Sequence, residues 1–163
     1  MKKQSDSFEL LELLNMALER ELQVSVQYMI QHGIAAGQKE AGIPLTSSEK
    51  QHNFVATHFP YFLPGNSLKK IAITEMRHAE AITERIVLLG GEPVSQPAKI
   101  IISETTRAML EDDLEQERSA IELYNKIIET SENSGDQITA KLFRIILKDE
   151  EGHHKIFSAT LKS

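Results

Sequence analysis

Apolar side chains recur every three or four residues in four long stretches of the chain, and this period places them on one face of an α-helix. The helices predicted in this way span residues 7–38, 66–89, 103–131 and 136–161. Gly90 and Gly91 end the second helix, and Ser103 is the predicted N-cap of the third. The pattern therefore predicts an all-α protein, an antiparallel four-helix bundle formed by a single domain over residues 1–163.

A carboxylate interrupts each apolar face near its centre, at Glu21, Glu75, Glu117 and Glu150. A buried unpaired charge is costly, and four of them without compensation would prevent folding. Histidines follow two of these glutamates by three residues, so each pair shares one helix face. The histidines are His78 and His153. Four carboxylates and two neutral imidazoles suit a pair of divalent metal ions, iron or manganese, because both ions accept oxygen and nitrogen ligands.

The two halves of the chain repeat this arrangement. LERE at 18–21 matches LEQE at 114–117, and a tyrosine, Tyr28 or Tyr124, follows the last glutamate of each copy by seven residues. The interval from that glutamate to the Glu-x-x-His motif is 54 residues in the first half and 33 in the second. The additional residues fall within 39–65, which we expect to form an insertion between the first and second helices. The repeat predicts two helix hairpins related by a pseudo-two-fold axis through the metal site.

Three further side chains lie on the ligand face. Tyr28 and Tyr124 are either core aromatics with a hydrogen-bonded hydroxyl or donors to a metal-bound carboxylate, and the two roles are compatible. Asp113 is either a carboxylate that supports the site or guides ions towards it, or a solvated residue on the flank of its helix. The periodicity leaves these alternatives open.

Residues beside the two histidine motifs point towards neighbouring helices or away from the ligands. We expect Asp149 to accept the outer N–H group of His78. Thr74 is expected to do the same for His153. Gly152 lies almost opposite the ligand face, so we expect a neighbouring subunit or loop to approach closely there.

The composition narrows the choice of function. The formal net charge is −6, and the only basic cluster near a terminus is Lys2 and Lys3, so the sequence disfavours nucleic-acid binding. The absence of cysteine excludes disulfides and thiolate-ligated metal centres. No apolar run reaches the ~18 residues of a membrane span, and the expected location is the cytoplasm.

Motifs in all four predicted helices resemble bacterioferritin. They are ELQVSVQY at 21–28, EMRHAEAITERI at 75–86, DLEQE at 113–117 and ILKDEEGH at 146–153. The resemblance implies a ferritin-like fold with a long crossover between helices 2 and 3. It also implies ferroxidase activity, in which two iron ions per subunit are bound as Fe²⁺ and oxidised by O₂ or H₂O₂ for iron storage or detoxification. The ligand roles that it implies are terminal for Glu21 and Glu117, bridging for Glu75 and Glu150, and binding to one ion each for His78 and His153.

The resemblance also bears on haem and on assembly. Met76 stands where bacterioferritins carry a haem-ligating methionine, which implies haem shared across a two-fold dimer interface; the alternative is an ordinary interface methionine. Only ten residues follow His153, too few for the fifth helix of 24-subunit ferritins, and the insertion at 39–65 is foreign to bacterioferritin. We therefore expect a homo-oligomer of subunits without a fifth helix, a Dps-like dodecamer, with a dimer as the alternative.

Two other functions fit the same motifs. One is a rubrerythrin-like diiron peroxidase or oxidase without storage, whose electron donor would be another protein because this chain has no cysteine. The other is a non-enzymatic ferritin-like scaffold that binds metal for stability. Iron load and turnover separate these functions from storage.

Overall fold

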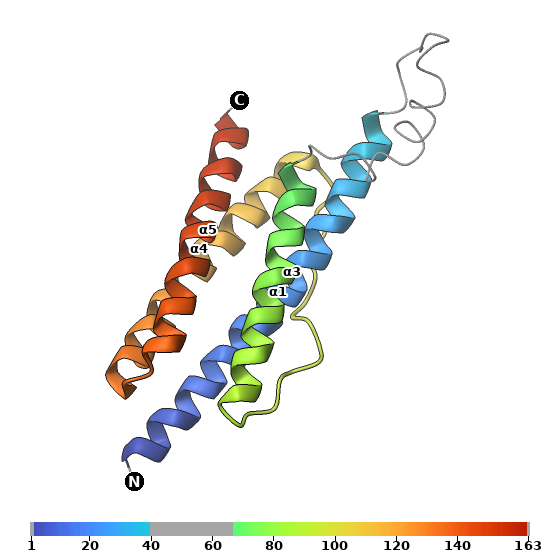
Figure 1. Cartoon of the computed structure of the whole chain (residues 1–163). Helices are drawn as coiled ribbons and strands as arrows, with labels where there is room; N and C mark the ends of the chain where they lie inside the picture. The colour runs from blue at the N-terminus through green and yellow to red at the C-terminus, as the bar shows by residue number, and fades with distance from the viewer. Residues whose placement is uncertain (1, 40–66, 163) are drawn as a thin grey trace, which may run out of the picture.

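The computed structural model describes residues 2–39 and 67–162 of the chain (Figure 1). These ranges contain four helices: α1 Lys2–Lys39, α3 Ser67–Leu88, α4 Thr106–Ser134 and α5 Gln137–Lys162. No strand occurs in the described residues. Each predicted helix corresponds to one of the four, with shifts of a few residues at the ends, so the predicted all-α class is confirmed.

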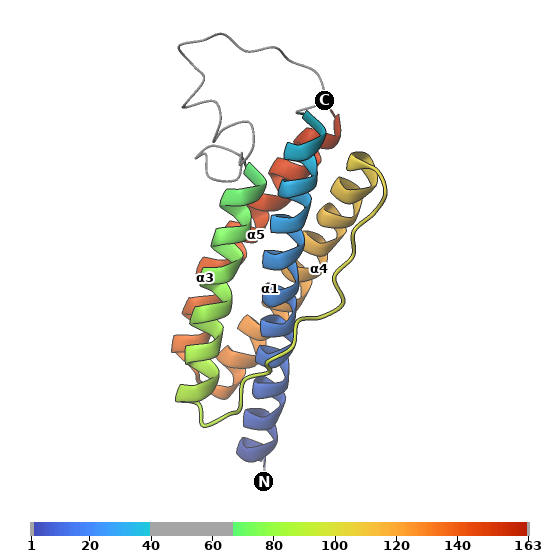
Figure 2. The same ribbon diagram turned by 90° about the vertical axis from the view of Figure 1, so that its right-hand side faces the viewer.

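The helices form two antiparallel hairpins, α1 with α3 and α4 with α5, which pack side by side (Figure 1). The segment from 89 to 105 then returns along the length of the bundle before α4 begins (Figure 2). Because of this return, α3 and α4 run in the same direction, while α1 and α4 are antiparallel. The segment is the long crossover expected between the second and third helices.

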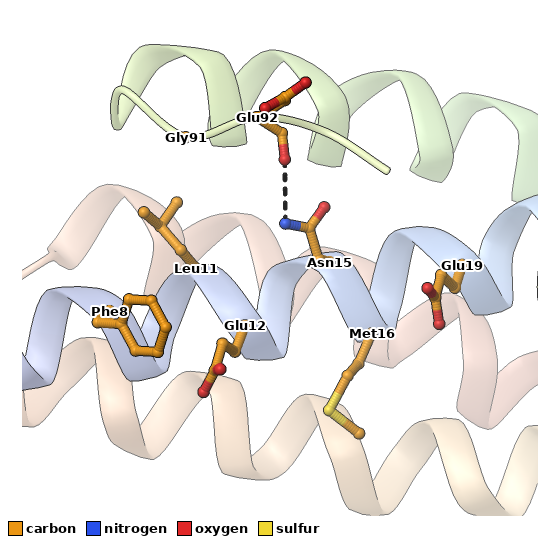
Figure 3. Close-up of a pocket in the computed structure, with 8 residues that line it drawn as sticks. All are labelled: Phe8, Leu11, Glu12, Asn15, Met16, Glu19, Gly91 and Glu92. Atoms are coloured by element: carbon orange, nitrogen blue, oxygen red, sulfur yellow. Dashed lines mark hydrogen bonds between the residues drawn. The ribbon is translucent and has the colours of Figure 1, made fainter. Parts of the chain in front are cut away.

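Hydrogen bonds fasten the crossover to α1. The side chain of Asn15 donates to the carbonyl of Glu92 at 3.1 Å (Figure 3) and accepts from the N–H of Val94 at 2.9 Å. Further along, the N–H of Ile101 donates to the side-chain oxygen of Gln27 at 2.9 Å. The crossover is thus paired with polar groups on one side of α1, which fixes where α4 starts.

Apolar side chains form two buried clusters separated by a polar layer. On α1 the larger cluster extends from Leu10 to Leu18, and the smaller one begins at Val24. On α5 the corresponding borders are Ile146 and Phe157. The carboxylates predicted on each helix fall in the interval between the clusters. Since burial stabilises by roughly 25 cal/mol per Å² of apolar surface, the two clusters hold the helices together above and below the polar layer.

The N-cap predicted for α4 was wrong. Thr105, with an extended backbone (φ −118°, ψ 149°), caps the helix by accepting from the N–H of Ala108 at 3.1 Å. Ser103 instead donates its hydroxyl to Asp112 at 2.5 Å. The physical reason is the crossover, whose pairing with α1 through Ile101 keeps the chain non-helical up to Thr105.

The turn between α4 and α5 is anchored to α3. Gly135 ends α4 in the left-handed region (φ +84°), and its N–H donates to the carbonyl of Glu132 at 3.0 Å. Asp136 caps α5 by accepting from the N–H of Thr139 at 3.0 Å. Arg85 reaches across from α3 and binds both oxygens of Asp136 at 2.7 Å. This pair fixes the end of one hairpin against the turn of the other.

Two predictions concern the parts of the chain around these helices. The insertion predicted at 39–65 lies, from residue 40 onwards, outside the described residues. Lys162, the last described residue, belongs to α5, so the expected absence of a fifth helix stays a prediction. None of the helices in the described ranges is both long and apolar enough to cross a membrane.

Candidate metal centre

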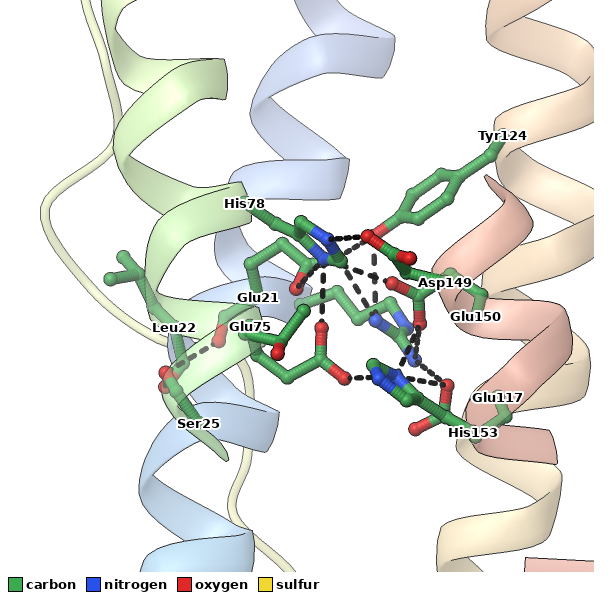
Figure 4. Close-up of polar contacts among 12 residues, drawn as sticks. Glu21, Leu22, Ser25, Glu75, His78, Glu117, Tyr124, Asp149, Glu150 and His153 are labelled. Carbon is green, nitrogen blue, oxygen red and sulfur yellow. Dashed lines mark hydrogen bonds and ion pairs between the residues drawn. The ribbon is translucent and has the colours of Figure 1, made fainter. Parts of the chain in front are cut away.

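The six predicted ligands meet in the polar layer between the two apolar clusters (Figure 4). All six are buried, and the four glutamates have no exposed surface. The α1–α3 hairpin supplies Glu21, Glu75 and His78, and the α4–α5 hairpin supplies Glu117, Glu150 and His153. Each hairpin therefore contributes three of the predicted ligands, and the layer joins the two halves of the bundle.

The donor atoms of these residues form two groups that share two carboxylates. We call them group A and group B. Group A consists of Glu21, Glu75, His78 and Glu150, and group B consists of Glu75, Glu117, Glu150 and His153. Within each group the donor atoms lie within 4.8 Å of one another. This arrangement is the one expected for two neighbouring metal positions with two carboxylates between them.

Glu75 and Glu150 each direct one oxygen to each group. In Glu75, Oε2 lies 2.9 Å from Nδ1 of His78, and Oε1 lies 2.8 Å from Nδ1 of His153. In Glu150, Oε1 lies 3.0 Å from Nδ1 of His78, and Oε2 lies 3.9 Å from Nδ1 of His153. Both histidines therefore present the same ring nitrogen to the carboxylates.

Most of these donor atoms have no hydrogen-bond partner in the described part of the chain. The unpartnered atoms are Glu21 Oε2, Glu75 Oε1, Glu117 Oε2, Glu150 Oε1 and Oε2, and His153 Nδ1. Some of these predicted metal-binding atoms lie close to one another but are not aligned for a hydrogen bond. This is expected of atoms that are directed at a common centre. Buried polar atoms without partners are rare and costly, so the site fits divalent cations. Carboxylate and imidazole ligands suit iron and manganese.

Burial changes the protonation of the cluster. It raises the pKa of Glu21 to about 7, and repulsion by Glu75 adds to the effect. It also raises the pKa values of Glu117 and Glu150. Burial alone would lower the pKa of His78, but the neighbouring carboxylates, that of Glu150 first, raise it by favouring the protonated ring. Without a metal cation the cluster therefore retains protons, which metal binding would displace.

The two tyrosines bond to carboxylates of the opposite hairpin. Tyr28 donates its hydroxyl to Oε1 of Glu117, and Tyr124 donates its hydroxyl to Oε1 of Glu21. Each bond leaves Oε2 of the same glutamate directed into the metal groups. Both rings are fully buried, so each tyrosine is a core aromatic and a donor to a predicted ligand at once.

Of the two outer contacts predicted for the histidines, the structure contains one. Asp149 Oδ2 lies 3.3 Å from Nε2 of His78, which is the predicted contact. The contact predicted between Thr74 and His153 is not formed, and that prediction was wrong. Thr74 instead donates its hydroxyl to the carbonyl of Lys70 in its own helix at 3.1 Å, a local bond that threonine often makes inside helices.

Arg20 also belongs to the centre, and the apolar periodicity did not predict it. Its buried guanidinium places Nη1 3.1 Å from Glu21 Oε1, and Nη2 3.4 Å from Oε2 of both Glu117 and Glu150. Burial alone would lower the pKa of Arg20, but these carboxylates raise it above its ordinary value, so the group stays charged. A signal was present in the repeat, where Arg20 corresponds to the uncharged Gln116.

Asp113 lies one turn before Glu117 and is fully buried, so it is not the solvated flank residue of the second alternative. Its Oδ1 accepts from the side-chain amides of Gln27 at 3.1 Å and Gln31 at 2.9 Å. Burial raises the pKa of Asp113 to about 6, although both amide bonds oppose the change. Asp113 is therefore held by neutral partners and lies outside both metal groups.

Met76 lies away from the carboxylate cluster. Its side chain is 55% exposed on α3, the helix that also carries two predicted ligands. Haem bound by one methionine from each of two chains requires a partner at this surface. The haem assignment therefore stays a prediction.

Comparisons with known proteins agree with this architecture. The Ferritin family model, described as a ferritin-like domain, matches residues 51–163. Bacterioferritin of Desulfovibrio desulfuricans is 33% identical over 144 residues, which are 88% of this chain and 69% of that protein. A shorter match to the bacterioferritin of Mycobacterium avium is 42% identical over 80 residues, covering 48% of this chain and 50% of the relative.

Solved structures of bacterioferritins have the same fold. The Desulfovibrio desulfuricans protein, whose diiron site is known in different catalytic states, matches with a TM-score of 0.73 and 30% identity over 98% of this chain and 82% of that one. Rhodobacter capsulatus bacterioferritin, with a metal-free dinuclear site and a haem iron in a crystallographic special position, matches with a TM-score of 0.72 and 26% identity over 94% and 84%. The chain therefore belongs to the ferritin-like family, and bacterioferritins are its relatives over most of its length.

Proposed function

We propose that the chain is a ferroxidase that binds two Fe²⁺ ions in the polar layer and oxidises them with O₂ or H₂O₂, for iron storage or detoxification. The observation that supports this function is the pair of donor groups that share Glu75 and Glu150, with unpartnered donor atoms in both groups. The two Fe²⁺ ions supply two electrons, which reduce O₂ to H₂O₂ or H₂O₂ to water. Manganese is the alternative metal because the ligand types suit both.

The chain contributes fixed ligand geometry to this reaction. The proposed terminal ligands are Glu21 and Glu117, the bridging ligands Glu75 and Glu150, and the nitrogen ligands His78 and His153. Tyr28 and Tyr124 each hold one oxygen of a terminal glutamate and leave the other free for the metal. Asp149 accepts from Nε2 of His78, which leaves Nδ1 as the nitrogen that would bind the metal once the metal has displaced its proton. The apolar clusters on both sides limit access of bulk water.

Aerobic addition of Fe²⁺ to the purified metal-free protein tests this function. We expect rapid oxidation of the first two Fe²⁺ ions per chain. Glu117→Gln should slow the oxidation by at least about tenfold, because loss of a ligand should cost no less than loss of a residue that orients one. The matched control is Glu115→Gln on the same helix, an exposed residue that should keep the wild-type rate. Equal oxidation rates in Glu117→Gln and the wild type would contradict the proposed site.

We propose that the chain acts as a homo-oligomer, with a dodecamer favoured and a dimer as the alternative. Its bacterioferritin relatives and the large apolar side chains exposed on α3 and α5 support assembly. The exposed residues include Val87, Leu88, Ile138 and Ile145. Light scattering on the iron-loaded sample should find a shell that holds far more than two irons per chain. A dimer that holds no more than two irons per chain would contradict a storage function and favour a rubrerythrin-like peroxidase or oxidase.

We also propose Met76 as a haem ligand shared between two chains. Its exposure on α3 leaves it accessible to a partner, and the Rhodobacter capsulatus relative contains haem iron. The alternative is an interface methionine without haem.

A further inference from the structure

The polar layer is nearly symmetric, and Arg20 breaks the symmetry. The glutamates, histidines and tyrosines of the two hairpins correspond one to one, and the tyrosine bonds are exchanged symmetrically. The residue before Glu21 is Arg20, whereas the residue before Glu117 is Gln116. One half of the centre therefore carries a buried positive charge that the other half lacks.

Arg20 is held in this position by the opposite hairpin. Its Nε and Nη2 donate to the backbone carbonyl of Gln116 at 3.4 and 3.2 Å. Its guanidinium carbon lies 5.7 Å from the centre of the Tyr124 ring, and Nη1 donates to the Tyr124 hydroxyl at 3.3 Å. These contacts orient the guanidinium towards the carboxylates of Glu21, Glu117 and Glu150.

The guanidinium contacts the two metal groups differently. Nη2 lies 3.4 Å from Oε2 of Glu117 and 3.4 Å from Oε2 of Glu150, the same oxygens that lie 3.9 Å from Nδ1 of His153 in group B. In group A, Nη1 contacts Oε1 of Glu21, whereas Oε2 of that glutamate lies 3.7 Å from Nδ1 of His78. Arg20 thus competes for the inner oxygens of group B and contacts only an outer oxygen of group A.

We propose that Arg20 makes the two metal positions unequal, so that group A binds the first divalent ion tightly and group B binds the second more weakly. A second ion at group B has to displace Nη2 from two carboxylates and to remain near a permanent positive charge. In group A, Arg20 contacts only the outer oxygen of Glu21, so a first ion there displaces no contact of the guanidinium. Arg20 is therefore a positioning residue, and the ion at group B is the exchangeable one. This inference rests on the proposed dinuclear site.

Binding of Co²⁺ to the metal-free, full-length protein tests the inference without turnover, since titration calorimetry and the absorption spectrum of bound Co²⁺ follow each ion. The wild type should bind two Co²⁺ per chain in two steps whose dissociation constants differ by at least about tenfold. Arg20→Gln, which copies the residue of the other half, should bring the two constants together by strengthening the second step. Arg118→Gln, which removes an exposed arginine from α4, is the matched control and should keep both steps.

Ligand variants assign the steps even if Arg20→Gln fails to fold. His78→Ala should remove the tight step, and His153→Ala should remove the weak one. Two equal steps in the wild type, or an unchanged separation in Arg20→Gln, would overturn the role of Arg20 while leaving the dinuclear site intact. Absence of any bound Co²⁺ would overturn the proposed site together with the inference.

Discussion

At the scale of single residues, the buried carboxylates differ in the groups that offset the cost of burying their charge. The glutamates of the metal groups are compensated by histidine, arginine and the proposed cations. Asp113 has only the neutral amides of Gln27 and Gln31, and its Oδ2 has no hydrogen-bond partner in the described residues. Burial is the main cause that raises the pKa of Asp113 from the ordinary 3.8 to about 6. Ionised Asp113 therefore costs stability at neutral pH.

Asp113→Asn should stabilise the metal-free protein, increasingly so as the pH rises. The pKa of Asp113 is higher in the folded state than in the unfolded state, so folding is favoured by proton binding to this carboxyl. The resulting stabilisation is complete below pH 3.8 and is lost as the pH rises through about 6. Asparagine avoids the loss and can still accept from both glutamine amides. The difference in the free energy of unfolding between variant and wild type, measured by urea denaturation from pH 4 to 7, should grow to on the order of 2 kcal/mol. A parallel pH dependence of the two proteins would contradict the assignment, and exposed Glu111→Gln serves as the control.

The buried glutamates and histidines of the polar layer could be predicted from the sequence, because each is an ionisable residue at a position that periodicity makes buried. Arg20 could not be found in the same way. It lies one residue before Glu21, on the flank of the stripe, and reaches the centre through its long side chain and the carbonyl of Gln116. The contact predicted for Thr74 was wrong for the opposite reason, because the short side chain of Thr74 bonds to a carbonyl of its own helix. Periodicity gives the direction of a Cβ atom but not the reach or local bonding of the side chain.

At the scale of the elements, the helices were predictable and some of their ends were not. The capping of α4 by Thr105 depends on a crossover that pairs with α1, a tertiary contact that the local sequence near Ser103 does not contain. Gly152 was expected to mark a close approach. A Cβ added there would meet no atom within 4 Å in the described residues, so a neighbouring loop in this part of the chain is not the reason for the glycine.

Two glycines allow backbone effects to be compared in similar surroundings. Among the residues that the structure describes, a Cβ at Gly135 or at Gly152 would meet no atom within 4 Å, but Gly135 has φ +84° whereas Gly152 lies inside α5. Gly152→Ala should raise the free energy of unfolding by about 0.5–1 kcal/mol through helix propensity. Gly135→Ala should lower it by about 1 kcal/mol because alanine disfavours the left-handed region. Urea denaturation measures both. If Gly152→Ala instead destabilised the protein and changed its size in light scattering, a neighbouring subunit would approach at that position.

At the scale of the whole molecule, the polar layer and the crossover join two hairpins that otherwise resemble each other. Three predicted ligands come from each hairpin, so ions bound in both groups would link the halves, and tighter binding should stabilise the bundle more. The pseudo-two-fold arrangement was readable from the repeat. The proposed assembly was not, because surfaces that would contact other chains carry no periodic signal, and exposed apolar residues such as Met76 fit more than one role.

Haem binding tests the role of Met76 against a closely matched methionine. Met76 on α3 is 55% exposed and Met16 on α1 is 54% exposed, so their replacement by leucine should affect the single chain equally. If two chains share a haem through Met76, titration should end at one haem per two chains, with an absorption spectrum of methionine-ligated iron. Met76→Leu should abolish this binding, and Met16→Leu should retain it. A wild type that binds no haem, together with a Met76→Leu variant that changes subunit association, would assign Met76 to the interface alone.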